Sequence, residues 1–307
     1  MSMSKIYYRN IVRLTFFFVI FTLSFSVQVV AFEFFSDSDH QYEIEDYEGS
    51  RDTLLLALKQ TDSKDVIAAI NWRLARAQVM IGGRLAEGEI EKEILLLEYQ
   101  KGVNYADVAI RYDPGIAEGY FWKSANLGRI GQVKGIFESL GKASEMRSLL
   151  SEAIQREPDY APAYHVLGML YEQVPGFPFS FGNIDSAVSF ARKAVLLKER
   201  EFEQGEDDQM SLNYYTELAV SLNKRNWNSE QRQREQPRKL RLFNREKDPL
   251  KRASFYEGQL LVEKISDREE AALLVGMVIE SFYKRGSLSR DEQTDLSDAK
   301  ELEKKLN

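Results

Sequence analysis

The chain has 307 residues, of which 44% are hydrophobic and 29% charged, and this composition is typical of a globular protein rather than a disordered one. Its formal net charge is −7, which argues against general nucleic-acid binding. The chain has no cysteine, which excludes disulfides, a lipoprotein-type lipid anchor and a thiol nucleophile.

Residues 1–31 have the order of a secretory signal peptide. Three basic residues without acids precede an apolar run at 14–23, and the small residue Ala31 ends the segment. Two interpretations stay open. The segment is either a signal cleaved after Ala31 or an uncleaved membrane anchor, since residues 14–31 are long enough to reach across a bilayer. In both cases we expect the body to be exported, as a periplasmic, secreted or membrane-anchored protein.

Residues 32–50 form an acidic segment between this signal and the body. Asp37, Asp39 and Glu48 occupy three of the ligand positions of a calcium loop, but Tyr42 stands where that loop needs glycine. We therefore expect a solvated acidic linker here and no metal site.

Residues 51–200 are helical and repetitive in pattern. The segments "DPGIAEGYFW" and "EPDYAPAYHV" place Pro114 and Pro158 44 residues apart, and Tyr120 and Tyr164 have the same spacing. In each segment the proline ends one helix, and a large aromatic residue begins the next after a short turn. The repeated unit is therefore a pair of helices.

The second unit carries a family resemblance. It resembles a tetratricopeptide repeat (TPR) in its large residues and its close-packed glycine and alanines, which are Tyr164, Leu167, Gly168, Tyr171, Ala187 and Ala194. The stretch from "YFWKSANLGRIGQVKG" to "AYHVLGMLYEQVPGFP" is similar to the divergent repeats of the regulator of microtubule dynamics protein family and its bacterial relatives. The resemblance implies an all-α, TPR-like solenoid of helical hairpins without catalytic residues, and for some members the handling of a hydrophobic ligand or lipid. An exported chain would not meet cytosolic microtubules, so the family name is not carried over.

The hairpin that starts at Tyr164 has an enlarged turn. A standard unit has about 34 residues, so the longer spacing leaves about ten residues to place. They fall in "VPGFPFSFGN", residues 174–183, where Asn183 is suited to cap the following helix. Its phenylalanines either fold back onto the repeat as a plug or form an exposed docking loop, and these are Phe177, Phe179 and Phe181.

Residues 201–307 form a helical C-terminal extension in this interpretation. The segment 224–252 has eleven lysines and arginines against four acids, and it is either a surface for phosphates or acidic partners or a solvated helix face. Ser266 with Glu269 and Ser289 with Glu292 have capping-box spacing, which predicts two further helices that cap the solenoid.

A TPR-like solenoid presents a concave groove, which the first helix of each hairpin lines. Helix spacing assigns to this candidate groove Arg73, Ala77, Phe121, Ala125, His165, Met169, Glu172 and Gln173. We therefore predict an exported interaction scaffold for a peptide or partner protein. The alternative is a carrier of a small hydrophobic ligand or lipid, with Phe121, Met169 and the loop phenylalanines lining its cavity.

Enzymatic chemistry has little support in the sequence. The chain has only two histidines, and no carboxylate pair can be assigned to a cleft from its spacing. We expect no catalytic, cofactor or metal site, no nucleic-acid partner, and membrane contact only if residues 1–31 stay attached.

Overall fold

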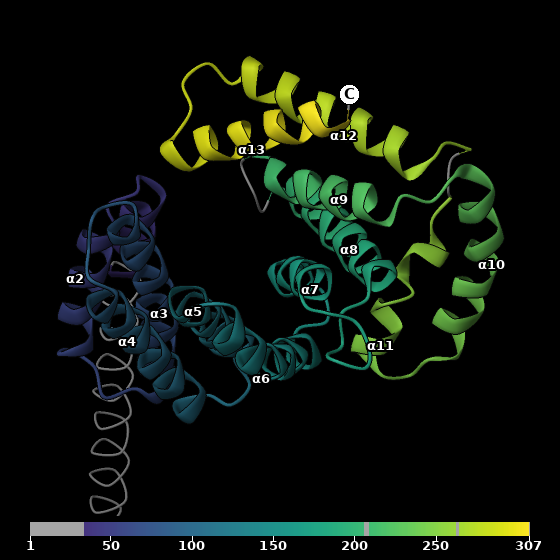
Figure 1. Cartoon of the computed structure of the whole chain (residues 1–307). Coiled ribbons are helices and arrows are strands. Elements are labelled where there is room, and N and C mark those ends of the chain that lie inside the picture. Colours follow the sequence, from purple (N-terminus) through teal and green to yellow (C-terminus); the bar gives the residue numbers. More distant parts are fainter. Residues whose placement is uncertain (1–33, 206–208, 262–263, 307) are drawn as a thin grey trace, which may run out of the picture. The chain divides into compact units, whose positions relative to one another are not determined.

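The structure is a computed structural model that describes residues 34–205, 209–261 and 264–306 (Figure 1). The predicted signal segment therefore lies outside the described residues. Within those ranges the fold is all-α, and extended pairing is limited to an isolated bridge between Gly176 and Gly182. The chain divides into two compact units at Val133, inside the predicted repeat region.

The first unit is a set of antiparallel helices. They are a helix over 34–43, α2 (Tyr47–Leu58), α3 (Lys64–Ala86), α4 (Lys92–Tyr112) and α5 (Ala117–Lys134). The hairpin of α3 and α4 is the main packing interaction, and α2 packs on α3. Phe34 and Phe35 pack against a buried core that includes Leu54 and Leu74. The start of the acidic segment is thus a packed helix, so the expectation of a solvated linker is wrong there.

A buried amide joins the helices of this unit. The Nδ2 of Asn126 on α5 donates to the carbonyl of Ala75 on α3 at 3.1 Å. Gly102 on α4 faces the same amide, and a Cβ at that position would lie 2.0 Å from the Asn126 Oδ1. Glycine is therefore required where α4 approaches α5.

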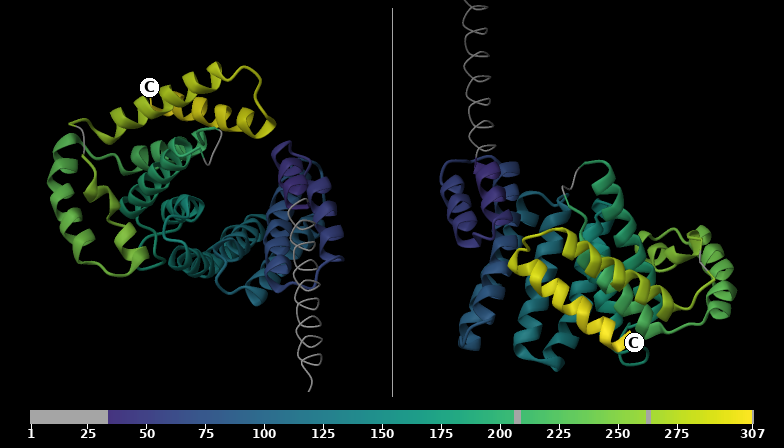
Figure 2. Two further views of the ribbon diagram at one scale, coloured as in Figure 1. Left: turned by 180° about the vertical axis from the view of Figure 1, so that it is seen from behind. Right: turned by 90° about the horizontal axis from the view of Figure 1, so that it is seen from above.

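The second unit begins with further hairpins and ends in a C-terminal helical region (Figures 1 and 2). Its helices are α6 (Ile136–Arg156), α7 (Ala161–Gln173), α8 (Ile184–Glu203), α9 (Leu212–Arg225), α10 (Ser229–Arg245), α11 (Pro249–Ala253), η1 (Tyr256–Gln259), α12 (Asp267–Lys284) and α13 (Arg290–Leu306). The α7–α8 pair forms a hairpin, α9 packs on α8, and α12 packs on both α9 and α13.

The six-residue spacing between proline and tyrosine in each repeat has a direct physical cause. The Tyr120 hydroxyl donates to the Pro114 carbonyl at 3.2 Å, and the Tyr164 hydroxyl donates to the Pro158 carbonyl at 2.8 Å. Each tyrosine thus bonds back to the turn that precedes its own helix. The same tie fixes the start of α5 and of α7, and the predicted helix starts are confirmed.

The predicted caps are also present. The Asn183 Oδ1 accepts the Ser186 N–H at 2.9 Å at the start of α8. Ser266 and Glu269 form a reciprocal capping box at the start of α12, where the Glu269 Oε2 accepts the Ser266 N–H at 2.7 Å. The two predicted C-terminal helices are therefore confirmed as α12 and α13.

Candidate functional site

The groove residues predicted in the first unit are already occupied by the protein itself. The Arg73 side chain pairs with Asp39 at 3.0 Å, and its guanidinium lies over the rings of Phe35 and Trp72. Ala77 is fully buried and Phe121 nearly so. The groove prediction is wrong for Ala77 and Phe121, which pack inward. Ala125, elsewhere on α5, is partly exposed.

The groove residues predicted in the second unit lie on α7, which contacts α9. We call these residues and their α9 neighbours the α7–α9 strip: His165, Met169, Glu172, Gln173, Tyr214, Glu217 and Lys224. The His165 ring stacks on Tyr214 with 4.1 Å between centroids. At the other end, the Lys224 ammonium donates to the Glu172 carboxylate at 2.7 Å. Gln173 is exposed, and Met169 is half-buried.

Burial shifts two titratable groups of the strip, His165 and Glu217, toward their neutral forms. Burial lowers the pKa of His165 to about 4, and its buried Nδ1 has no hydrogen-bond partner within residues 34–205, 209–261 and 264–306. Burial, with the nearby Glu172 carboxylate, raises the pKa of Glu217 to about 8 against the opposing effect of Lys224. Around pH 7 the strip therefore holds a neutral imidazole and a largely protonated Glu217 beside one ion pair.

The α7–α8 loop is pinned at its base. The Gly182 N–H donates to the Pro175 carbonyl at 2.9 Å, and the Asn183 N–H donates to the Tyr171 carbonyl at 2.9 Å. A Cβ on Gly182 would lie 1.9 Å from the Val174 carbonyl oxygen, so this position needs glycine. Residues 177–181 thus form the tip of a closed loop.

The loop phenylalanines divide between the two interpretations. Phe181 turns back onto Tyr171 with 5.0 Å between ring centroids, and the Arg147 guanidinium lies 4.3 Å above its ring. Phe177 and Phe179 are 93% and 88% exposed. Phe181 therefore folds back onto the repeat, whereas Phe177 and Phe179 project into solvent.

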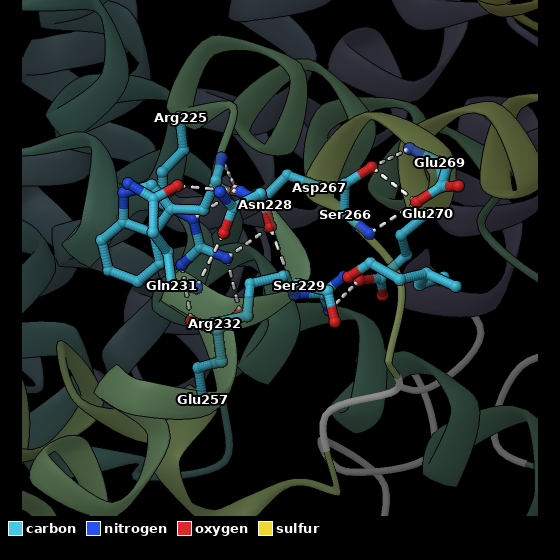
Figure 3. Close-up of polar contacts among 12 residues, drawn as sticks. Arg225, Asn228, Ser229, Gln231, Arg232, Glu257, Ser266, Asp267, Glu269 and Glu270 are labelled. Atoms are coloured by element: carbon cyan, nitrogen blue, oxygen red, sulfur yellow. Dashed lines mark hydrogen bonds and ion pairs between the residues drawn. The ribbon is translucent and has the colours of Figure 1, made fainter.

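A buried ion cluster joins α8, α9, α10, η1 and α12, and Figure 3 shows the part of it around Arg225, Arg232, Glu257, Asp267 and Glu270. It consists of four basic and four acidic side chains: Arg192, Arg225, Arg232, Lys239, Asp185, Glu257, Asp267 and Glu270. Arg225 is its centre, since it donates to Asp267 at 2.8 Å, to Glu257 at 2.5 Å and to Asp185 at 3.0 Å. Arg192 forms a bidentate pair with Glu270, with both bonds at 2.8 Å.

The pairing in the ion cluster overcomes the cost of burial. Burial alone would raise the pKa of Glu257, but Arg192, Arg225 and Lys239 lower it well below its usual value. Burial alone would lower the pKa of Arg225, but its bonds to Asp267 and Glu257 raise it. Glu257 and Arg225 are therefore charged over the neutral pH range.

The ion cluster was missed at the level of sequence. Three of its cations come from the basic segment 224–252, for which we considered only a binding surface or a solvated face. Arg225, Arg232 and Lys239 instead point inward and are buried. Their seven-residue spacing, which repeats a position on a helix face, is the signal that could have identified them.

A cavity of about 340 Å³ lies beside the ion cluster. Arg192, Arg232 and Glu270 form its polar part, and Tyr215 on its wall donates to Glu199 at 2.7 Å. The apolar part comes from α8, α9, α12 and the segment after η1, and consists of Val195, Leu196, Leu218, Leu260, Leu261 and Leu274.

Residues 34–205, 209–261 and 264–306 contain no group of three histidine or carboxylate side chains placed to hold a metal ion. In the same ranges, helices long and apolar enough to cross a bilayer are absent.

The chain is similar to known proteins over its first half. Residues 34–177 match the model of the family described as Regulator of microtubule dynamics protein 1-3. Regulator of microtubule dynamics protein 1 of Bos taurus is 26% identical over 148 residues, which cover 48% of this chain and 44% of that protein. The Mus musculus protein of the same name is 25% identical over 137 residues, which cover 45% of this chain and 42% of that protein. The matched region is thus less than half the length of these curated relatives.

Among solved structures, a thermophilic TPR protein of Thermus thermophilus aligns with a TM-score of 0.52 and 14% identity, over 85% of this chain and 94% of that chain. This likeness concerns the fold alone. It extends beyond the family match, and the ion cluster lies outside residues 34–177. The chain therefore has a TPR-like helical fold, and its residues 34–177 are similar to the regulator of microtubule dynamics family.

Proposed function

We propose that this chain is an exported, non-enzymatic scaffold whose α7–α9 strip binds an extended peptide or a helix of a partner protein. The observation that supports this is the composition of the strip. Gln173 and Lys224 are exposed, and the buried Oε1 of Glu217 has no hydrogen-bond partner among the residues that the structure describes. Polar groups held in this way on a repeat fold suit recognition better than catalysis.

The strip suits a peptide backbone because it is almost neutral. The Gln173 amide can both donate and accept, and a protonated Glu217 can donate to a carbonyl. Glu172 already holds Lys224, so the strip carries little free charge. We therefore expect a partner that offers backbone amides and apolar side chains for Met169, rather than a highly charged one.

Site-specific photocrosslinking in living cells tests this proposal. A photoreactive amino acid at Gln173 should capture a defined partner, whereas the same residue at exposed Arg234 on α10 should not. Lys224→Glu, which repels Glu172 and disrupts the strip, should abolish the crosslink. Equal capture from both positions, or a crosslink that survives Lys224→Glu, would contradict the proposal.

Export is tested separately, by the mass of the protein purified from its own cells. A mass that lacks residues 1–31 supports a cleaved signal, and a full-length mass in the membrane fraction supports an anchor. A full-length chain in the cytosolic fraction would contradict export.

A second candidate function, a carrier of a small hydrophobic ligand, is favoured by the cavity of about 340 Å³ beside the ion cluster. Its apolar wall differs from the lining we predicted, because Phe121 is buried in the first unit. Native mass spectrometry distinguishes the two functions. A bound small mass that disappears on unfolding and is lost in Leu218→Asp supports the carrier, and a bare chain supports the scaffold.

A further inference from the structure

The tip of the α7–α8 loop presents two aromatic rings to solvent. Phe177 and Phe179 are almost fully exposed, while the bridge between Gly176 and Gly182 holds the loop closed beneath them. A backbone bond from the Phe179 N–H to the Gly176 carbonyl, 3.1 Å long, shapes the tip itself. A folded loop therefore holds both rings in water. Exposure of apolar surface to water is unfavourable, and such exposed patches often mark a contact surface.

A cavity of about 500 Å³ opens next to this loop, between α6, the start of α8 and α11. Phe181, two residues from Phe179, lies on its wall. Hydroxyls line it from one stripe of α6 and from two other elements: Ser144, Ser148, Ser151, Ser186 and Ser254.

The cavity also holds two cations without carboxylate partners. Arg147 contacts the face of Phe181, and neither Arg147 nor Lys251 forms an ion pair in the described part of the chain. The only acid in the lining, Asp248, accepts the backbone N–H of Lys251 at 2.8 Å and caps α11. The cavity thus offers positive charge and hydroxyl donors, which are the groups that bind phosphate oxygens.

We propose that this face docks on an anionic phospholipid surface. Phe177 and Phe179 enter the interfacial layer, where aromatic rings are favoured, and a lipid phosphate binds Arg147 and Lys251 in the cavity. An anionic lipid surface matches both features of this face. Its phosphates complement the charge of Arg147 and Lys251, and its interfacial layer accommodates the exposed rings on the adjoining loop. The site uses none of the strip residues, so it adds a second contact to the proposed scaffold.

A fluorescent label on the loop tests the proposal in the full chain. The protein has no cysteine, so Ser180→Cys provides a single attachment point for an environment-sensitive dye at the tip. The label should shift to the blue on vesicles of phosphatidylcholine and phosphatidylglycerol, and not on vesicles of phosphatidylcholine alone. The dye reports on the environment of the loop tip, and residues 1–31 are the same in every variant. Any membrane affinity of residues 1–31 therefore affects all the labelled proteins equally.

Variants of the labelled chain identify the contacts. Phe177→Ser with Phe179→Ser should weaken the response by more than about tenfold. Arg147→Gln with Lys251→Gln should weaken it by about 30-fold, since each cation near an anionic surface contributes about fivefold. The matched controls are exposed Tyr283→Ser and Arg234→Gln, which should respond as the parent does.

Three results would overturn the proposal. They are a label that ignores phosphatidylglycerol vesicles, a response that survives loss of both rings, and a response to dissolved glycerol 3-phosphate without one to vesicles. The last result would identify a soluble phosphate ligand instead.

Discussion

Replacing Arg225 with methionine removes the centre of the ion cluster and keeps a side chain of similar length. The Arg225 side chain is 1% exposed, and that of its partner Asp267 is fully buried. In the variant, Asp267 keeps a longer ion pair with Arg232 at 3.3 Å and the hydrogen bond from the Trp227 N–H at 2.9 Å, and Glu257 loses two hydrogen bonds. Uncompensated buried charge of this kind costs about 3–5 kcal/mol.

The neighbouring residue provides the control. Lys224 is 52% exposed and makes a single surface pair, with Glu172, so Lys224→Met should cost about 0–1 kcal/mol. At about 2–4 °C per kcal/mol for a unit of this size, the expected fall in Tm is about 6–20 °C for Arg225→Met and at most about 4 °C for Lys224→Met.

Thermal unfolding followed by circular dichroism measures both variants. The pH dependence adds a second check, because the pKa of Glu257 is depressed in the folded state. Its stabilising effect is present above the unfolded pKa and is lost as pH falls through the folded one, so the difference between Arg225→Met and the parent should shrink in acid. Equal shifts for the two variants at neutral pH would refute the argument.

Three further predictions concern other buried groups. In the parent, the free energy of unfolding should fall as pH rises from 4.5 to about 8, because the raised pKa of Glu217 means that the folded chain binds this proton more tightly than the unfolded chain does. Glu217→Gln should remove this loss of stability. Melting curves at stepped pH measure this, and an unchanged slope would contradict it. His165→Gln should remove a loss of stability on acidification from pH 6.5 to about 4, because burial lowers the folded pKa of the imidazole, and the same curves test it. Gly182→Ala should open the α7–α8 loop to proteases, because the new Cβ would collide with the Val174 carbonyl. Gly83→Ala, which has open space around its Cβ, should leave cleavage unchanged.

The hairpins were predictable because their signals are local. The tie from Tyr164 to Pro158 spans six residues, and the caps at Asn183 and Ser266 act over three. Side chains that satisfy nearby backbone groups leave a fixed spacing in the sequence. The fold class, the helix starts of α5 and α7 and the last two helices could therefore be predicted.

The ion cluster was less predictable than the hairpins because its paired residues are distant in the chain. Arg225 pairs with Asp267, 42 residues later, and Lys239 with Asp185, 54 residues earlier. The net charge of one segment does not show whether acidic residues from elsewhere in the chain will pack against it. The basic segment 224–252 was therefore interpreted as exposed. The groove prediction failed at Ala77 and Phe121 for a related reason. Helix spacing gives a face, but packing decides whether that face is covered.

The position of α12 in the ion cluster affects the order in which the second unit can be completed. Arg192, Arg225, Arg232 and Lys239 all precede α12 in the chain, whereas Asp267 and Glu270 lie in its first turn. Until α12 has left the ribosome, four cations have only Asp185 and Glu257 to neutralise them. The charges between α8, α9 and α10 are therefore balanced only after α12 has packed against these helices. A chain that stops before α12 would leave two positive charges there without acidic partners.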